Sequence, residues 1–264
     1  MHDKSCFKYF NFSNIFPING FKKDETYNLL ISSPDKNLVR ELYSIFKEDL
    51  DSIKNIGILK IKLQDVKIFN KKLSFPWMTA TPIVLKKCKR VYLSNGKTIL
   101  FLDIKNLNIL EYLGFEKSKQ KIDFNNMNKI KIDLNTLKNI DPRFFKIIKI
   151  DDRYYSFNQG DNLLDWLDSL KKNSILKYNN FFNTDFELEE PIFEELKFRK
   201  EVVVEPKIKN KGKAIIIGLD WKKLSISRTL DKEEKRFYQF LFDCGLGILN
   251  SMGFGFVNTG QTNK

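Results

Sequence analysis

The spacing of apolar and polar residues in the first third of the chain predicts the order strand, strand, helix, strand. Residues 7–12 and 27–32 are rich in aromatic and branched side chains and flank a turn-prone segment, as neighbouring strands do. A helix is predicted next, with Asp35 or Ser33 as its N-cap and an apolar face of Leu38, Leu42, Ile45, Phe46 and Leu50. Residues 57–70 then alternate like a half-buried strand. This order is most of a ferredoxin-like fold, which has one further strand and helix at its front.

The last hundred residues also mix helices and strands. A helix is predicted from Asp161, with Trp166 at its flank and a buried face of Leu163, Leu164, Leu167 and Leu170. Residues 197–221 predict a hairpin with its tip at residues 210–212. A final helix carries Phe237, Phe240, Leu241 and Cys244 on one face. The fold class is therefore α+β, in two halves without a short internal repeat.

The middle of the chain is harder to interpret. Residues 91–102 predict a hairpin around Asn95-Gly96, a common turn pair. The segment Asn95-Gly96-Lys97-Thr98 also looks like the end of a phosphate-binding P-loop, but Val91 stands where that motif needs its first glycine. Residues 104–150 mix short apolar pieces with Asn and Lys, which suggests an insertion.

Four glycines follow the final helix, at positions 245, 247, 253 and 255. Asp231 and Glu234 form a candidate capping box at the start of that helix, Gly245 suits its C-terminal end, and residues 254–257 predict a strand. Because glycine accepts positive φ and has no Cβ, we expect a tight loop that presents bare N–H groups to an anion such as phosphate. A dinucleotide fingerprint is excluded, since it needs strand, glycines and helix in that order, and Asn250 stands at its third glycine.

Charge favours a polyanionic partner, either nucleic acid or an acidic membrane surface. Lys and Arg outnumber Asp and Glu by 46 to 33, a net charge of +13, although an AT-rich coding sequence can produce the same excess of Lys, Asn and Ile. The predicted hairpin concentrates this charge at Lys197, Arg199, Lys200, Lys207, Lys209, Lys211 and Lys213. These lysines could instead guard a solvated edge against aggregation. The rigid apolar runs beside them favour nucleic-acid contact.

Other site classes find no support. Cys6, Cys88 and Cys244 lie far apart, so neither a disulfide framework nor a zinc site is predicted. We expect no cofactor. The sequence has no signal peptide and no apolar run long enough to span a membrane, so we expect a soluble, cytoplasmic protein.

Several short motifs occur here in the order and spacing of a known family. Residues 250–255 (Asn-Ser-Met-Gly-Phe-Gly) with Gly245 and Gly247 look like a C-terminal glycine-rich signature; residues 10–13, 31–33 and 81–84 are similar to earlier strand motifs. On these the chain resembles the CRISPR-associated endoribonucleases that cut precursor crRNA inside its repeats, the sixth Cas family of the RAMP superfamily. Residues 95–150 find no counterpart.

The resemblance implies two ferredoxin-like (RRM-like) domains in tandem. The first, residues 1–90, is incomplete, because the chain begins after the family's first strand and helix; the second, residues 91–264, carries the insertion near residues 95–150, the basic hairpin and the glycine loop. It further implies metal-independent cleavage, in which a 2′-hydroxyl attacks the neighbouring phosphate and leaves a 2′,3′-cyclic phosphate. The implied partners are CRISPR repeat RNA or crRNA, with an effector complex and a homodimer as candidates.

The resemblance also assigns residues. His2, the only histidine, matches the family's catalytic base or acid, and Lys8 the cation that stabilises the phosphorane. The expected RNA contacts are Gly245, Gly247, Asn250, Ser251, Gly253, Gly255, Lys197, Arg199, Lys200, Lys207, Lys209 and Lys211. Two explanations of the short N-terminus stay open: a shortened form, or a natural variant that binds RNA and cuts poorly or not at all.

Two alternative functions also stay open. One is a non-catalytic RNA-binding protein that holds the processed guide, and the other is a basic α+β protein with no RNA role. A histidine at position two is ordinarily a functionless terminus. Several aromatic residues could stack on bases, but we expect most of them to be core: Tyr154, Tyr155, Trp166, Tyr178, Phe181 and Phe182.

Overall fold

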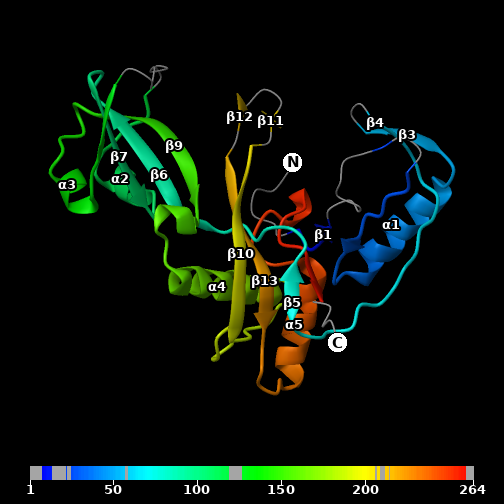
Figure 1. Ribbon diagram of the computed structural model, residues 1–264. Coiled ribbons are helices and arrows are strands. Elements are labelled where there is room, and N and C mark those ends of the chain that lie inside the picture. The colour runs from blue at the N-terminus through cyan, green and yellow to red at the C-terminus, as the bar shows by residue number, and fades with distance from the viewer. Residues whose placement is uncertain are drawn as a thin grey trace. The chain divides into compact units, whose positions relative to one another are not determined.

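The computed structural model describes residues 8–13, 22, 25–56, 59–118, 127–205, 207–208, 212–213 and 215–259; residues 54–56, 59–60, 207–208 and 212–213 are described by their backbone only. The chain divides into two compact units (Figure 1). The first contains residues 1–84 and 157–264, and the second, inserted unit contains residues 85–156.

A four-stranded antiparallel sheet forms the centre of the first unit. Its strands are β5 (Trp77–Thr79), β10 (Glu195–Val204), β13 (Ile216–Ser225) and β14 (Val257–Thr259), in the spatial order β10-β13-β5-β14. A one-turn helix, η1 (Phe157–Gln159), and the helix α4 (Leu163–Phe182) precede β10, and α5 (Lys232–Cys244) precedes β14. The chain order of this sheet and its helices α4 and α5 is therefore β-α-β-β-α-β, interrupted after β5 by the inserted unit.

Aromatic side chains join the sheet to its two helices. Trp77 of β5 stacks on Phe242 of α5 with ring centroids 5.2 Å apart, and Trp221 of β13 stacks on Trp166 of α4 at 4.9 Å. All four rings are buried to 1% exposure or less. Burial of such large apolar surfaces is the main term that holds helices on a sheet.

The basic hairpin is confirmed as a structural element. Strands β10 and β13 pair antiparallel from Glu195 opposite Ser225 to Val204 opposite Ile216. Two short strands, β11 (Lys207–Ile208) and β12 (Gly212–Lys213), continue the pairing toward the tip.

Residues 8–62 contribute two small pairs of strands and one helix. As predicted, β1 (Asn11–Phe12) pairs with β2 (Ile31–Ser32), and Asp35 caps α1 (Lys36–Glu48) by accepting hydrogen bonds from two backbone N–H groups. The strand predicted over residues 57–70 is confirmed only over β4 (Leu59–Lys62) and is wrong in its extent. Instead β3 (Ile53–Ile56) and β4 form a hairpin, and the chain beyond it pairs with no strand, so that Ile68 is 49% exposed. Alternation alone does not make a strand without a partner.

The inserted unit has a sheet and a core of its own. Its strands are β6 (Lys86–Ser94), β7 (Thr98–Ile104), β8 (Asn128–Lys131) and β9 (Lys146–Tyr154), in the order β8-β7-β6-β9. The short helices α2 (Asn108–Tyr112) and α3 (Leu134–Lys138) complete it. The hairpin predicted at Asn95-Gly96 is confirmed, with the Asn95 side chain accepting from the N–H groups of Lys97 and Thr98.

The helices confirm some predicted faces and correct others. In α5 the four predicted apolar residues are buried and the Asp231–Glu234 capping box is present, while the last strand begins at Val257 rather than at residue 254. The predicted face of α4 is confirmed at Leu170, which is fully buried, but is wrong in the first turn, because Leu163 and Leu164 are 39% and 70% exposed and Trp166 is fully buried. The first turn of α4 exposes Leu163 and Leu164, and the larger indole ring of Trp166 packs in the core in their place. Within the described part of the chain, no helix has the length and apolar character needed to cross a membrane.

Candidate functional site

The glycine loop, residues 245–256, joins α5 to β14 and includes the one-turn helix η2 (Asn250–Met252). All four of its glycines have φ between +71° and +86°. A Cβ on Gly255 would lie 1.9 Å from the carbonyl oxygen of Leu246, and one on Gly247 would lie 2.4 Å from that of Val84. These glycines therefore permit close approach between segments of the protein itself.

The expectation that the loop presents bare N–H groups to phosphate is wrong for three of the four glycines. The N–H of Gly245 donates to the carbonyl of Leu241, that of Gly255 to the carbonyl of Pro82, both at 2.8 Å, and that of Gly253 closes η2 at 2.9 Å. Gly245, Gly247 and Gly255 are also buried. A direct RNA contact by the buried Gly245, Gly247 and Gly255 therefore has no structural support.

A buried lysine of α4 holds the loop from inside. Lys177 is 2% exposed, and its Nζ donates to the carbonyls of Gly245 at 2.7 Å and Gly247 at 3.1 Å and to Oδ1 of Asn250 at 3.0 Å. Burial lowers the pKa of Lys177. The cation lies at the C-terminal end of α5, where the helix dipole and unpaired carbonyls favour positive charge.

Lys177 was not among the site residues predicted from the sequence. Its signal was present, because Leu170, Ser174, Lys177 and Tyr178 recur at helical spacing and form one buried stripe of α4. A charged residue in such a stripe needs buried partners.

Asn250, predicted to contact RNA, is buried and ties the loop together. Its Nδ2 donates to the carbonyls of Leu246 at 3.0 Å and Phe254 at 2.9 Å, in addition to the contact with Lys177. The fully buried Asn11 of β1 lies against Gly245, where a Cβ would be 2.0 Å from its Nδ2. Strand β1 also contacts η2. The early strand motif and the glycine signature are thus packed together.

The accessible part of this assembly is small. Ser251 and Gly253 are partly exposed and Met252 is 53% exposed. Lys8 is exposed, directly before Tyr9, whose ring lies 4.8 Å from that of Phe181. His2 lies outside the described residues. The structure therefore places one predicted catalytic residue, Lys8, at the start of the segment that contacts η2.

The basic hairpin presents cations along an edge strand. A β-bulge around Phe198 interrupts the alternation of β10, so Lys197, Arg199 and Lys200 are all exposed. Arg199 lies 3.4 Å from the carboxylate of Asp220. Lys207 is described by its backbone only, and Lys209 and Lys211 lie outside the described residues.

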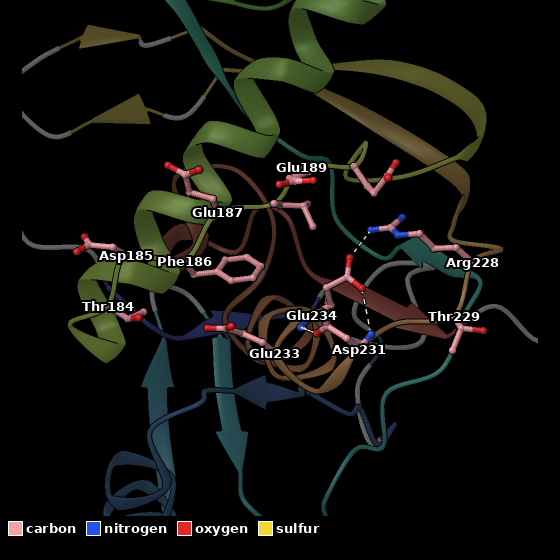
Figure 2. Close-up of a pocket in the computed structure, with 12 residues that line it drawn as sticks. Thr184, Asp185, Phe186, Glu187, Glu189, Arg228, Thr229, Asp231, Glu233 and Glu234 are labelled. Carbon is pink, nitrogen blue, oxygen red and sulfur yellow. Dashed lines mark hydrogen bonds and ion pairs between the residues drawn. The ribbon is translucent and has the colours of Figure 1, made fainter.

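A hollow of about 700 Å³ lies beside the loop after α4 and the start of α5 (Figure 2). Carboxylates dominate its lining: Asp185, Glu187, Glu189, Glu190, Asp231, Glu233 and Glu234, with Arg228. Such a concentration of negative charge repels phosphate. The hollow is therefore unsuitable for RNA.

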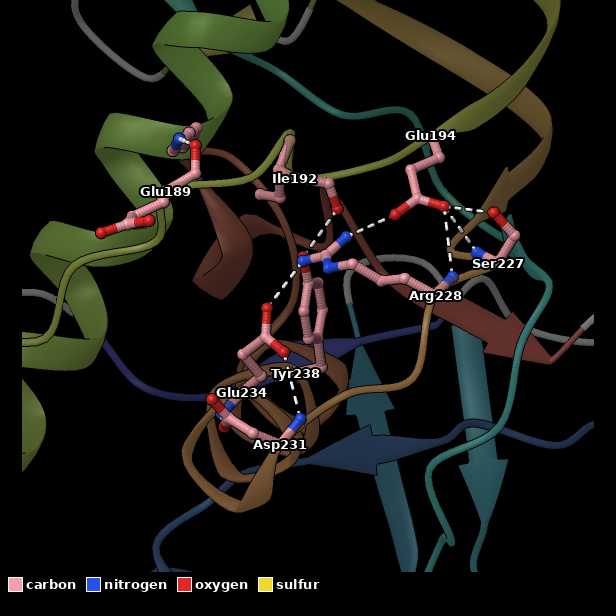
Figure 3. Close-up of polar contacts among 9 residues, drawn as sticks. Glu189, Ile192, Glu194, Ser227, Arg228, Asp231, Glu234 and Tyr238 are labelled. Atoms are coloured by element: carbon pink, nitrogen blue, oxygen red, sulfur yellow. Dashed lines mark hydrogen bonds and ion pairs between the residues drawn. The ribbon is translucent and has the colours of Figure 1, made fainter.

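Arg228 organises one wall of this hollow (Figure 3). Its guanidinium binds Glu194 and Glu234 at 2.7 Å each. Hydrogen bonds from Ser227 and Arg228 lower the pKa of Glu194 to about 2. The hydroxyl of Tyr238 donates to the carbonyl of Ile192 at 2.9 Å. These contacts fix the turn between β13 and α5 against the start of β10, a structural role.

A second lysine is partly buried near β14. Lys71 donates to the carbonyl of Val257 at 2.8 Å and to Oδ1 of Asn258 at 3.0 Å, and lies 3.8 Å from the ring centroid of Phe242. Burial lowers the pKa of Lys71 to about 8 and raises that of Asp243 to about 6. No group of side chains suited to holding a metal ion occurs in the described part of the chain.

Comparison with known proteins gives a consistent result. Residues 145–259 match the family model described as CRISPR associated protein Cas6, C-terminal. The chain is 30% identical over 264 residues to the CRISPR-associated endoribonuclease Cas6 2 of Methanocaldococcus jannaschii, an alignment that covers 98% of this chain and 83% of the relative.

Solved structures show the same fold at lower identity. A CRISPR associated protein Cas6 superposes with a TM-score of 0.54 at 19% identity, covering 98% of this chain and 81% of the other. A Cas6-related protein from Pyrococcus furiosus gives 0.54 at 17% identity, with 97% and 79% covered, and a RAMP protein that binds different RNA substrates gives 0.53 at 17%, with 95% and 78% covered.

Proposed function

The chain belongs to the Cas6 family of CRISPR-associated proteins, and from that membership we propose that it binds CRISPR repeat RNA and cleaves precursor crRNA without a metal ion. The observation that carries the proposal is the 30% identity to a Cas6 endoribonuclease over 98% of this chain. A CRISPR effector complex and a homodimer stay predictions as further partners.

The proposed architecture is a tandem of two ferredoxin-like domains. In the second, the elements β5-α4-β10-β13-α5-β14 and the sheet order β14-β5-β13-β10 support a β-α-β-β-α-β unit. The first contains β1, β2, α1 and the β3–β4 hairpin. On this assignment the second domain begins before β5, ahead of the residue 91 expected from the sequence, and the inserted unit interrupts it after its first strand.

The proposed chemistry is transesterification at a scissile phosphate. The upstream 2′-oxygen forms a bond to phosphorus as the bond to the 5′-oxygen breaks, which leaves a 2′,3′-cyclic phosphate and a 5′-hydroxyl. His2 would transfer a proton to or from one of these oxygens, since imidazole titrates near neutrality. Lys8 would stabilise the phosphorane charge, a role supported by its exposure beside β1.

The proposed RNA grip combines the basic hairpin with the accessible part of the glycine loop. Lys197, Arg199 and Lys200 lie exposed on an edge strand, and Lys207, Lys209 and Lys211 would extend this surface. Ser251 and Gly253 are the loop residues open enough to approach a ribose or phosphate. Gly245, Gly247, Asn250 and Gly255 would act indirectly, by shaping the loop.

The test is cleavage of repeat RNA in EDTA. We expect cutting that leaves a 2′,3′-cyclic phosphate and that stops when the scissile position carries a 2′-deoxy sugar. His2→Ala and Lys8→Ala should each lower the cleavage rate by about 10²–10⁴-fold, with Lys22→Ala, an exposed lysine of the same region, as the control. A salt-sensitive band shift without cutting would favour the non-catalytic RNA-binding alternative. The absence of both binding and cutting would refute an RNA role.

A further inference from the structure

The sheet of the inserted unit has one face covered by helices. Leu93 of β6 and Leu100 of β7 lie opposite each other on this face and belong to a buried core. Leu110 of α2 and Leu137 of α3 belong to the same core. Because side chains alternate along a strand, the strand residues next to Leu93 and Leu100 in sequence, Tyr92 and Phe101, point to the other face.

A row of four residues crosses that other face. Lys131 of β8 is in register with Phe101 of β7, Phe101 with Tyr92 of β6, and Tyr92 with Lys149 of β9. The two rings lie 6.0 Å apart by their centroids and are both partly exposed. The two lysines at the ends of the row are exposed. We call these four residues the aromatic row.

Cations also lie near the rings themselves. The Nζ of Lys149 is 5.6 Å from the centroid of the Tyr92 ring, and the guanidinium of Arg90 is 5.3 Å from that of Phe101. Arg90 holds Asp103 through hydrogen bonds of 2.7 and 3.0 Å, and that contact fixes it beside Phe101. The Lys149–Asp151 ion pair is solvent-exposed, and such pairs contribute little to stability. Lys149 can therefore exchange the Asp151 carboxylate for a phosphate.

This arrangement fits a single-stranded nucleic acid. Adjacent aromatic rings on the two central strands of a four-stranded sheet offer π surfaces on which successive bases stack, and flanking lysines attract the phosphates. A fully paired duplex hides its base faces, so only its phosphates could contact this surface, through the lysines.

We propose that the aromatic row of the inserted unit binds single-stranded RNA, with bases stacked on Tyr92 and Phe101 and phosphates held by Lys131 and Lys149. This is a second RNA site, on residues that largely precede the segment matched by the family model. The choice of RNA over DNA rests on the proposed function, and the stacking itself rests on the geometry above.

The test uses the full chain and a 20-nucleotide oligo(U) without repeat sequence, with binding followed by fluorescence anisotropy. The double variant Tyr92→Leu/Phe101→Leu keeps apolar bulk but removes the π surfaces, and should weaken binding at least tenfold, as loss of base stacking does. Lys131→Ala/Lys149→Ala should reduce the slope of log K against log salt by about 1.4, at roughly 0.7 per lost phosphate contact.

Tyr112→Leu is the matched control, since Tyr112 is 88% exposed on α2, which covers the opposite face. Thermal melting of each variant checks that the sheet persists. The proposal is overturned if the wild-type chain fails to bind oligo(U), if the leucine variant binds it as well as wild type, or if oligo(dT) binds while oligo(U) does not.

Repeat-RNA cleavage by the same proteins separates this inference from the proposed function. We expect the leucine variant to cleave a minimal repeat at the wild-type rate. If the wild-type chain leaves repeat RNA uncut yet binds oligo(U) through Tyr92 and Phe101, the proposed function fails and this inference stands.

Discussion

The ammonium group of Lys177 in α4 donates a 2.7 Å hydrogen bond to the carbonyl oxygen of Gly245 at the end of α5. This contact joins two helices that are far apart in sequence and holds the glycine loop from the protein interior. It explains why the loop can contain so many glycines and still be ordered, because its carbonyls converge on one buried donor.

Replacing Lys177 by methionine should destabilise the protein by about 3 kcal/mol. Methionine fills the space but leaves the carbonyls of Gly245 and Gly247 and the Asn250 side chain without this donor, and each buried unpaired group costs about 1–3 kcal/mol. Relief of the desolvated charge offsets part of this loss. Urea unfolding measures the change. Lys172→Met, at an exposed position of the same helix, should stay within about 0.5 kcal/mol of wild type.

The glycines of the loop should differ sharply in their tolerance of alanine. Gly253 has φ +86° and open space where a Cβ would stand, so Gly253→Ala should cost about 1–2 kcal/mol of left-handed strain. Gly255→Ala adds a clash with the Leu246 carbonyl and should cost about 1–3 kcal/mol more. Equal losses in the two variants, measured by chemical unfolding, would show that close packing around Gly255 is unimportant.

Charge removal on the edge strand should weaken RNA binding in a salt-dependent way. In Lys197→Ala/Lys200→Ala two candidate phosphate contacts disappear, so the slope of log K for repeat RNA against log salt should fall by about 1.4. The exposed pair Lys232→Ala/Lys235→Ala on α5 removes the same charge elsewhere and serves as the control. If both pairs change the slope equally, the hairpin has no special role and net charge alone drives binding.

The Glu194–Arg228 contact predicts a specific response to acid. The pKa of Glu194 is lowered to about 2 from an ordinary value of 4.5, so its contribution to stability is complete above about pH 4.5 and is lost as the pH falls toward 2. Glu194→Gln should be less stable than wild type at pH 7, and the difference should shrink between pH 4.5 and 2. A difference that stays constant over this range in urea unfolding would contradict the assignment.

Local patterns in the sequence predicted the elements well where one physical signal dominates. The capping box of Asp231 and Glu234, the Asn95-Gly96 turn and the apolar face of α5 each depend on neighbouring residues, and each is confirmed. The first turn of α4 was not predicted correctly, because which residues are buried there depends on Trp221, a partner 55 positions away from Trp166. Non-local packing overrides local periodicity there.

The candidate site was less predictable than the fold. A run of glycines signals a close approach, but the sequence cannot say whether RNA or another part of the chain makes that approach; Val84 and Leu246 do so here. The roles of Lys177 and Asn250 depend on contacts between α4 and a loop about 70 residues later. The tandem domain boundaries stay a prediction, and so do the roles of His2 and Lys8, which the cleavage experiment tests.

The inserted unit begins and ends at one point, because the N–H of Tyr155 donates to the carbonyl of Leu85 at 3.0 Å. An insertion whose ends touch replaces a short connection without stretching its host, and its length adds little entropic cost. Such a module can be gained, exchanged or deleted in evolution while the surrounding β-α-β-β-α-β order is preserved. A junction of this kind is also a natural place for an engineer to graft a different recognition module.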